Sequence, residues 1–308
     1  MPELPDVTAY IEALERHTKG RVLRGIRLQS AFVLRTVDPP IQELAGRTVT
    51  GYQRIGKRIV FEFHDREPQR YLVLHPMIAG RLRKQKAGAT LNRKTGLAAF
   101  DFDDFTIVLT EASTRKRASL HVVASAEELV EHDPGGIDVM SSSVAEFEAA
   151  LTQRNHTIKR ALTDPRYLSG IGNAYSDEIL HRAKMSPFKQ TQTMTREDFE
   201  LLHHVTVEVL EAWIQRFRHE VGEGFPDKVT AFRPEMAVHG KYGEPCPVCG
   251  RKVQRIRYAD NEMNYCAQCQ TGGKLFADRS LSQLLKKDWP RTLDELEERV
   301  ERAKGRGD

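Results

Sequence analysis

Hydrophobic and polar positions follow two different periods along the chain, and the first is the period of strands. Up to about residue 125 the chain carries short β-branched or alternating runs, separated by turn residues. Such runs predict strands, and many short strands in succession indicate an antiparallel sandwich or barrel. The Asp103-Asp104 step between two of the runs predicts a hairpin turn. The expected strands lie within residues 21–28, 47–54, 58–64, 71–75, 97–102, 105–110 and 118–123.

Helical spacing occurs at the start of the chain and again after about residue 137. The stretch from Asp6 to Lys19 repeats apolar residues every three or four positions and ends before Gly20, which favours a helix stop. The later pattern predicts helices at 144–151, 156–162, 174–184 and 196–220, and a further amphipathic helix in the C-terminal tail.

Shifts in composition divide the chain into four parts. The Asp-Pro-Gly-Gly cluster at 133–136 separates the strand-rich part from the helical part, which ends in a looser stretch at 221–235. We therefore expect an α+β multidomain protein. Its parts are an N-terminal antiparallel β-sandwich with a leading helix (1–132), a helical domain (137–235), a small cysteine-containing finger with a β-hairpin (238–276) and an extension (277–308).

Composition and charge exclude some classes and decide little else. The 308 residues are 40% hydrophobic and 29% charged, which argues against a disordered chain and against a membrane-embedded one. No apolar run approaches the roughly 20 residues that span a bilayer, and no secretory signal is recognisable. The net charge of +4 only hints at an anionic partner, but the basic residues gather in short segments such as 54–58, 81–86, 115–117 and 251–257.

All four cysteines fall in one short segment. Cys246, Cys249, Cys266 and Cys269 form C-x2-C-x16-C-x2-C, which predicts one structural Zn²⁺ held by four thiolates. A closed site of this kind leaves no position for a substrate water, so the metal should stabilise a fold. Two disulfides or unrelated thiols are the alternatives. The intervening hairpin carries Arg255 and Arg257, which can place positive charge on a phosphate backbone.

The N-terminus offers a second candidate chemistry. If Met1 is removed, Pro2 becomes a free secondary amine, and an α-amine with a pKa near 8 is partly unprotonated at neutral pH. Such an amine can attack an electrophilic sugar carbon to form an iminium, with the adjacent Glu3 carboxylate moving protons. An ordinary helix lead-in, with Pro near the helix start and Asp6 as a cap, explains the same residues.

Five segments in order resemble one family. MPELPDV is similar to the PELPEV start of the formamidopyrimidine-DNA glycosylase / endonuclease VIII (Fpg/Nei) family of base-excision repair enzymes. RIGKRIVFEF resembles its strand-turn-strand with a lysine at the turn, here Lys57. LHPMIAGRLR resembles its HLGMxGxLR segment and places His75 at the histidine. LTDPRYLSGIGNAYSDEIL resembles the signature of its helix–two-turn–helix element, and VHGKYGEPCPVCG with NYCAQCQ resembles its zinc finger.

The resemblance implies a bifunctional DNA glycosylase and AP lyase that excises oxidised bases from double-stranded DNA and acts on abasic sites. It implies that Pro2 attacks C1′ and forms a Schiff base, that Glu3 is the acid/base partner and that Lys57 assists; β- and δ-elimination then cleave the strand. DNA contacts are implied for His75, Lys159 and Asn173. We further expect a monomer without a membrane role, at a cytoplasmic, nucleoid-associated location of the bacterial type.

The sequence differs from the family at the residues that are expected to fill the gap left in the DNA stack when the damaged base is flipped out. The family's D-x-R-R-F-G loop corresponds to EASTRKRASLHVV, which has no Phe. Either Arg115, Lys116 or Arg117 inserts in its place, or the three form a basic loop that faces phosphates. The Met of HLGMxG aligns with Ile78, and the zinc-finger arginine aligns with Asn261. These changes leave the lesion preference open and suggest that 8-oxoguanine opposite cytosine is not favoured.

Two other functional classes compete with the glycosylase. A catalytically silent protein that binds damaged DNA could use the same scaffold, but Pro2, Glu3 and Lys57 are all retained. A zinc-ribbon transcription or RNA-associated protein explains the cysteines but neither PELPDV nor GIGNAYSDE.

Overall fold

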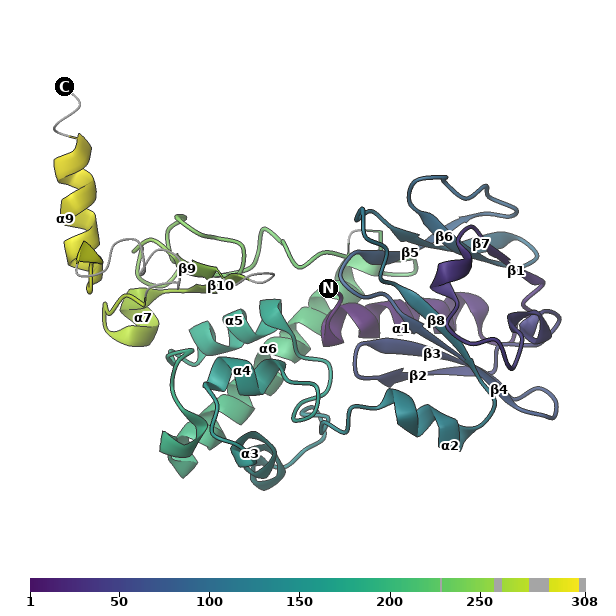
Figure 1. Ribbon diagram of the computed structural model, residues 1–308, viewed down its shortest axis with the longest axis horizontal. Coiled ribbons are helices and arrows are strands. Elements are labelled where there is room, and N and C mark those ends of the chain that lie inside the picture. Colours follow the sequence, from purple (N-terminus) through teal and green to yellow (C-terminus); the bar gives the residue numbers. More distant parts are fainter. Residues whose placement is uncertain (228, 258–261, 277–287, 305–308) are drawn as a thin grey trace. The chain divides into compact units, whose positions relative to one another are not determined.

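The computed structural model describes residues 1–227, 229–257, 262–276 and 288–304. The chain divides into two compact units: residues 1–138 with 210–231, and residues 139–209 with 232–308. Figure 1 labels the elements of both. The predicted α+β class with a sandwich, a helical part and a hairpin finger is confirmed.

The first unit is an antiparallel β-sandwich with a helix packed on it. One sheet has the order β1-β6-β7-β5 and the other the order β2-β3-β4-β8 (Figure 1). The strands of the first sheet are β1 (Gly25–Leu28), β5 (Gly80–Lys86), β6 (Gly96–Asp101) and β7 (Phe105–Glu111). Those of the second are β2 (Gly51–Ile55), β3 (Arg58–Phe63), β4 (Arg70–His75) and β8 (Ser119–Val123).

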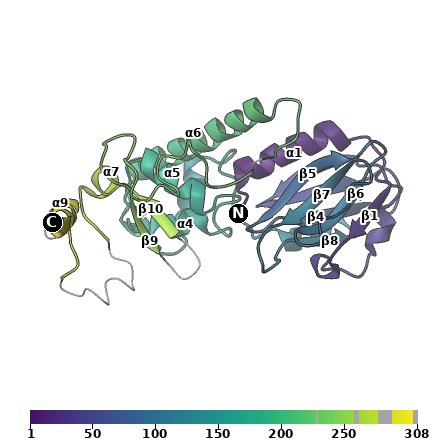
Figure 2. The same cartoon turned by 90° about the horizontal axis from the view of Figure 1, so that it is seen from above.

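One hydrophobic core joins both sheets to the leading helix α1 (Leu4–Thr18). Phe61 and Leu72 from one sheet, Phe100 and Ile107 from the other, and Tyr10 of α1 are all buried in it. Figure 2 shows α1 alongside the strands. The core thus lies where the alternating strand pattern places its apolar residues, on the inner faces of two stacked sheets.

The strand expectations hold except for β5, which the sequence pattern did not reveal. Its sequence GRLRKQK is mostly charged or polar, because β5 lies at the edge of its sheet and pairs only with β7. Edge strands commonly carry exposed charged residues. The predicted hairpin at Asp103-Asp104 joins β6 to β7.

The first unit also contains residues 210–231, the second half of α6 and the stretch that follows it. Val229 is buried in the sandwich core and Phe225 packs against it, so residues 210–231 cluster with the sandwich and not with the helices. From the sequence, these residues are expected in a helical domain over 137–235. The difference arises because two apolar side chains in a stretch without periodicity return to the first core.

The second unit contains the predicted helices and the finger. The helices are α3 (Val144–Thr152), α4 (Ile158–Thr163), α5 (Asn173–Arg182) and the first part of α6 (Arg196–Val221). All their bounds lie within two residues of those expected. The finger has a β-hairpin, β9 (Gln254–Arg257) paired with β10 (Glu262–Tyr265), followed by α7 (Ala267–Thr271). Short elements are α2 (Ala126–Leu129) and the 3-10 turns η1 (Ala31–Val33), η2 (Ile41–Leu44), η3 (Val130–His132) and η4 (Thr191–Thr193).

The C-terminal extension adds α9 (Leu293–Lys304), whose start packs on the finger. Leu293 is buried with Ile256 and Tyr265 of the hairpin. Arg251 donates to Asp294 at 3.1 Å and also pairs with Glu297.

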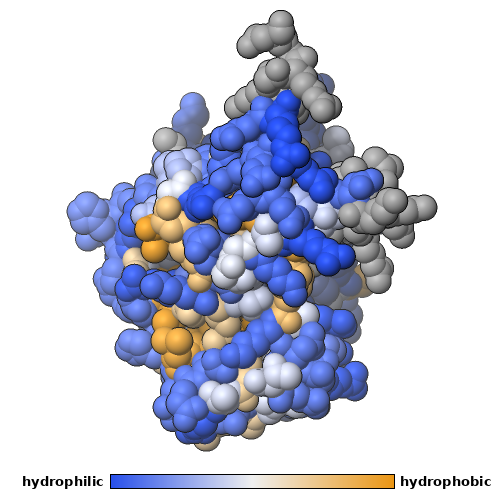
Figure 3. Space-filling view, turned by 90° about the vertical axis from the view of Figure 1, so that its left-hand side faces the viewer, coloured by the Kyte–Doolittle hydropathy of each residue, from blue (hydrophilic) through white to orange (hydrophobic). Residues whose placement is uncertain are grey.

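The molecular face in Figure 3 is mostly hydrophilic with small hydrophobic patches. Within the described ranges, no helix has both the length and the apolar composition to cross a bilayer.

Candidate active site and metal centre

Behind an exposed Met1, the first residues of the chain are buried at the start of α1. Pro2 is buried, Glu3 is only 3% exposed and serves as the N-cap of α1, and its backbone N–H donates to Asp6 Oδ2 at 2.8 Å. The helix thus begins before the expected Asp6, which is not the N-cap but the N3 residue of a capping box with Glu3. The same contact fixes the backbone of Glu3 beside the chain terminus.

The surroundings of the terminal amine favour its neutral, nucleophilic form. Burial lowers the pKa of the Met1 amino group; Arg81 and Lys57 lower it further, whereas Glu3 and Asp6 raise it. The structure therefore brings Glu3 and Lys57, which lie 54 positions apart in the sequence, into one electrostatic environment with the N-terminus.

Asp6 carries an unusual carboxyl group. Burial raises its pKa to about 7, and its Oδ1 atom is buried without a hydrogen-bond partner. A buried carboxylate with one unpartnered oxygen is costly to ionise. Asp6 is thus close to half-protonated near neutral pH, beside the terminal amine.

Lys57 lies at the turn between β2 and β3, as expected from the sequence. Gly56 before it has φ of +59°, a conformation that favours glycine, and Arg54 donates to the Gly56 carbonyl at 3.0 Å. Arg54 also pairs with Asp138. These contacts hold the turn that presents Lys57.

His75 ends β4 and is neutral at physiological pH. Burial lowers its pKa to about 3, with further lowering by the charges of Arg58 and Lys57. A neutral imidazole can donate or accept a hydrogen bond but brings no charge. The prediction that His75 contacts DNA stays a prediction, now limited to a hydrogen bond.

Arg81 is a residue of this site that the sequence analysis named only within a basic run. It begins the edge strand β5, and its guanidinium donates to the backbone oxygens of Gly80, at 2.7 Å, and of Val229. Its charge acts on the terminal amine, on Asp6 and on Tyr10. The only available signal was its place in the segment LHPMIAGRLR.

The loop after β7 that replaces the family's RRFG loop is organised by Glu111. The Glu111 carboxylate accepts from the backbone N–H of Arg117 at 2.8 Å and of Ala118 at 3.0 Å, and its carbonyl accepts from the Lys116 ammonium. Arg115 and Arg117 are exposed, whereas Lys116 is turned back to the base of the loop. Of the three candidates for insertion, the structure therefore leaves the two arginines presented to solvent.

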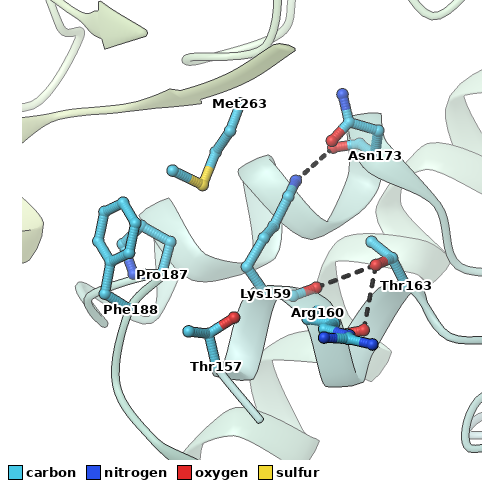
Figure 4. A pocket seen from close by; sticks show the side chains of 8 residues that line it. All are labelled: Thr157, Lys159, Arg160, Thr163, Asn173, Pro187, Phe188 and Met263. Atoms are coloured by element: carbon cyan, nitrogen blue, oxygen red, sulfur yellow. Dashed lines mark hydrogen bonds between the residues drawn. The ribbon is translucent and has the colours of Figure 1, made fainter. Parts of the chain in front are cut away.

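In the second unit, Lys159 is engaged by protein acceptors. Its ammonium donates to the Asn173 carbonyl at 2.7 Å, to Ser176 Oγ at 2.7 Å and to Asp177 Oδ1 at 2.5 Å, and the residue is 9% exposed. Figure 4 shows the ammonium directed at Asn173. An ammonium has three protons, so direct phosphate contact by Lys159 stays a prediction that would require one of these bonds to break.

Asn173 is the first residue of α5 and lines a hollow of about 310 Å³ with Lys159, Arg160, Phe188 and Met263 (Figure 4). Its side-chain amide donates to the carbonyl of Glu262 on β10. The predicted DNA-binding residue is thus positioned by the hairpin of the finger, and its contact with DNA stays a prediction.

Arg255 and Arg257 lie together on β9, as expected, and share one acidic partner. Glu262 approaches Arg255 at 3.7 Å and Arg257 at 3.5 Å, and the Arg255 guanidinium stacks over Tyr242 at 4.1 Å from the ring centroid. Both pairs are partly exposed, so solvent screens them and both arginines remain accessible to an anion. Asn261 lies outside the described residues.

The four cysteines converge as a zinc site requires. Their sulfur atoms all lie within 4.8 Å of one another, with 3.4 Å between Cys249 and Cys266 and 3.9 Å between Cys246 and Cys269. A tetrahedral Zn²⁺ with bonds of about 2.3 Å separates its sulfurs by about 3.8 Å, so this donor set fits one structural zinc ion. The predicted cofactor is confirmed.

Comparisons with known proteins agree with this arrangement. Residues 1–127 match the model of the formamidopyrimidine-DNA glycosylase N-terminal domain, residues 136–221 that of the H2TH domain of the same glycosylase, and residues 243–272 that of a zinc finger found in FPG and IleRS.

A formamidopyrimidine-DNA glycosylase from Desulforamulus reducens is 30% identical over 283 residues, covering 88% of this chain and 99% of its own length. A formamidopyrimidine-DNA glycosylase-like protein from Mycobacterium tuberculosis is 42% identical over 153 residues, covering 50% of this chain and 93% of its own.

Solved structures give the same result. Lactococcus lactis Fpg in complex with abasic-site DNA superimposes with a TM-score of 0.75 at 25% identity, covering 87% of this chain and 99% of that one. The wild-type Lactococcus protein in complex with oxidised-pyrimidine DNA gives 0.76 at 26% identity, with coverage of 88% and 100%. The landmarks that suggested the family from the sequence lie within the matched segments.

Proposed function

Because the chain belongs to the formamidopyrimidine-DNA glycosylase family, we propose that it is a DNA glycosylase and AP lyase acting on oxidised bases and abasic sites in duplex DNA. The observation that carries the proposal is the position of the chain start: Pro2 and Glu3 are buried, and burial, Arg81 and Lys57 lower the pKa of the adjoining Met1 amine. A polar, charged environment around a buried amine is unexpected in a plain helix lead-in.

In the proposed reaction, removal of Met1 leaves Pro2 as the terminal amine. The Pro2 nitrogen forms a bond to C1′ while the glycosidic bond breaks, and its electron pair leaves with the base, which takes up a proton. The proton of the attacking secondary amine passes to the Glu3 carboxylate, which then gives it to the sugar-ring oxygen. The bond between C1′ and that oxygen breaks, and the ring opens to an iminium. Loss of a C2′ proton then expels the 3′ phosphate, and a second elimination expels the 5′ phosphate.

The other predicted residues would hold the DNA. Lys57 supplies positive charge near the reacting nitrogen, and His75 supplies a neutral hydrogen bond. Asn173, at the N-terminus of α5, and the arginines of β9 are placed on the second unit, where free N–H groups and positive charge favour phosphate. The target base must leave the stack to reach the amine, as in other base-excision enzymes.

Borohydride reduction tests the covalent step. The mature protein is mixed with a duplex containing one abasic site, reduced and digested, and the cross-linked peptide is sequenced by mass spectrometry. We expect the adduct on residue 2 of a protein that has lost Met1. An adduct on an internal lysine such as Lys57 would overturn the Pro2 mechanism.

A catalytically silent binder gives a different result in the same assay. It would shift the duplex in a gel without any reducible adduct. Glu3→Gln keeps the terminal amine and the size of the side chain but removes the acid/base group, so its trapping should be weaker than that of the wild type. Partly buried Glu12, on the same helix and paired with Arg218, gives the matched control Glu12→Gln, which should trap like the wild type.

The same proposal includes a lesion preference. The loop after β7 offers exposed Arg115 and Arg117 but no aromatic wedge, and Ile78 is 51% exposed at the position of the family's methionine. We therefore propose that 8-oxoguanine opposite cytosine is excised more slowly than oxidised pyrimidines. Single-turnover rates on matched duplexes test this, and equal or faster release of 8-oxoguanine contradicts it.

A further inference from the structure

Four side chains on one face of α5 contact the finger. Asn173, Asp177, Glu178 and His181 follow one another at intervals of four, one and three, which places them along one side of the helix. Each reaches residues between 237 and 264. α5 is therefore the element on which the finger is mounted.

The two middle residues, Asp177 and Glu178, bind mainly backbone N–H groups. The Glu178 carboxylate accepts from the N–H groups of Ala237, Val238 and His239 at 2.7–2.9 Å. Asp177 Oδ2 accepts from the Asn264 N–H at 3.2 Å and contacts His239 Nδ1 at 2.7 Å. These bonds fix the chain on both sides of the first Cys-x-x-Cys knuckle.

The last contact is to a sulfur of the metal centre. His181 Nε2 lies 3.2 Å from Cys246 Sγ, and both residues are buried, at 5% and 2% exposure. A zinc-bound thiolate carries no proton. The proton between these two atoms must therefore belong to the imidazole, and the interaction is an N–H···S hydrogen bond from His181 to the thiolate.

We propose that His181 is an outer-sphere residue of the zinc centre, which donates its Nε2–H to the Cys246 thiolate and thereby retains the metal and links it to α5. A hydrogen bond to a thiolate disperses its negative charge, and four thiolates on one divalent ion carry a net charge of −2 that must be stabilised in a buried site. Groups of this kind contribute about 10–100-fold in metal affinity. The role is independent of the proposed lyase chemistry.

Zinc release measures this contribution directly. Holoprotein is mixed with an excess of a chromophoric chelator, and the release rate is followed by absorbance. His181→Phe keeps a ring of similar volume and removes the donor, so we expect release about 10-fold faster or more. His203→Phe is the matched control. His203 is partly buried, and its Nε2 contacts the Ser142 carbonyl at 2.9 Å, away from the metal. Equal release from wild type and His181→Phe would overturn the proposal.

Two further measurements keep the proposal testable if His181→Phe folds poorly. In wild-type protein loaded with ¹¹³Cd, a hydrogen bond to the thiolate gives scalar coupling between the metal and the His181 Nε2 proton, and its absence counts against the bond. In Co²⁺-loaded protein, absorption bands of a four-sulfur site support an outer-sphere role. Bands of a site with three sulfurs and one nitrogen would make His181 a ligand and overturn the proposal.

Discussion

The buried carboxyl of Asp6 predicts that this protein loses stability as the pH rises toward neutrality. The pKa is raised by burial from 3.8 to about 7. Between these values the folded protein holds a proton on Asp6 that the unfolded chain has released. Because the folded state then binds more protons, its stability falls with rising pH through this window. Above pH 7 the full free-energy cost of ionising the buried carboxyl is present.

The size of the cost follows from the two pKa values. The difference between 3.8 and about 7 corresponds to about 4 kcal/mol. Asp6→Asn keeps an oxygen that can accept from the Glu3 N–H and never ionises. We expect the variant to match the wild type in stability near pH 4 and to exceed it by up to about 4 kcal/mol at pH 8.

Urea unfolding at the two pH values measures this difference. Trp213 is 7% exposed and lies in the first unit, so its fluorescence reports on the sandwich when Trp289 is replaced by Phe in every protein compared. Asp104→Asn is the matched control, because Asp104 is an exposed aspartate of the same unit, and its effect should differ far less between pH 4 and pH 8 than that of Asp6→Asn. A gain from Asp6→Asn that is the same at pH 4 and pH 8 would refute the reasoning.

Three more predictions concern other parts of the molecule. Because burial and nearby cations lower the pKa of His75 to about 3, its imidazole NMR signals should not shift between pH 5 and 8, and a titration near 6.5 would contradict the structure. Lys159→Met should lower stability by about 3–5 kcal/mol in thermal unfolding, because it leaves the Asp177 carboxylate without its buried cation, and adding Asp177→Asn should recover part of the loss. Leu293→Ala should cost about 2–5 kcal/mol and speed amide exchange in the finger hairpin, because Leu293 is buried against it, whereas exposed Val300→Ala should not.

Segments with a clear hydrophobic period were predictable, because which of their side chains are buried follows from the spacing within the segment itself. The helix at 196–220 and the strands at 58–64 and 71–75 have apolar residues at the spacing of their own element, and the structure has them within a residue or two. The cysteine spacing predicted a metal site for a similar reason, since two short knuckles place two thiolates each. The edge strand β5 carries little such signal, because few of its side chains are buried.

Long-range electrostatics were not predictable from the pattern. Lys159 looks like a solvated lysine in the sequence, and only the fold places three acceptors of α5 around it. Arg81 and the buried state of Asp6 depend likewise on how β5 and α1 pack. The family resemblance indicated which residues matter at the N-terminus, but not that the Asp6 carboxyl has an unpartnered oxygen.

The discontinuity of the first unit bears on how the chain folds during synthesis. Residues 1–138 emerge from the ribosome without the segment 210–231, which supplies Val229 to the sandwich core and the carbonyl that Arg81 binds. At about 5–20 residues per second, the 93 residues from 138 to 231 take roughly 5–20 s to translate. During that interval the nascent sandwich has an incomplete core next to β5, an edge strand whose charged side chains disfavour pairing with other chains. The charged sequence that weakens the strand pattern of β5 thus also disfavours edge-to-edge pairing while the core is incomplete.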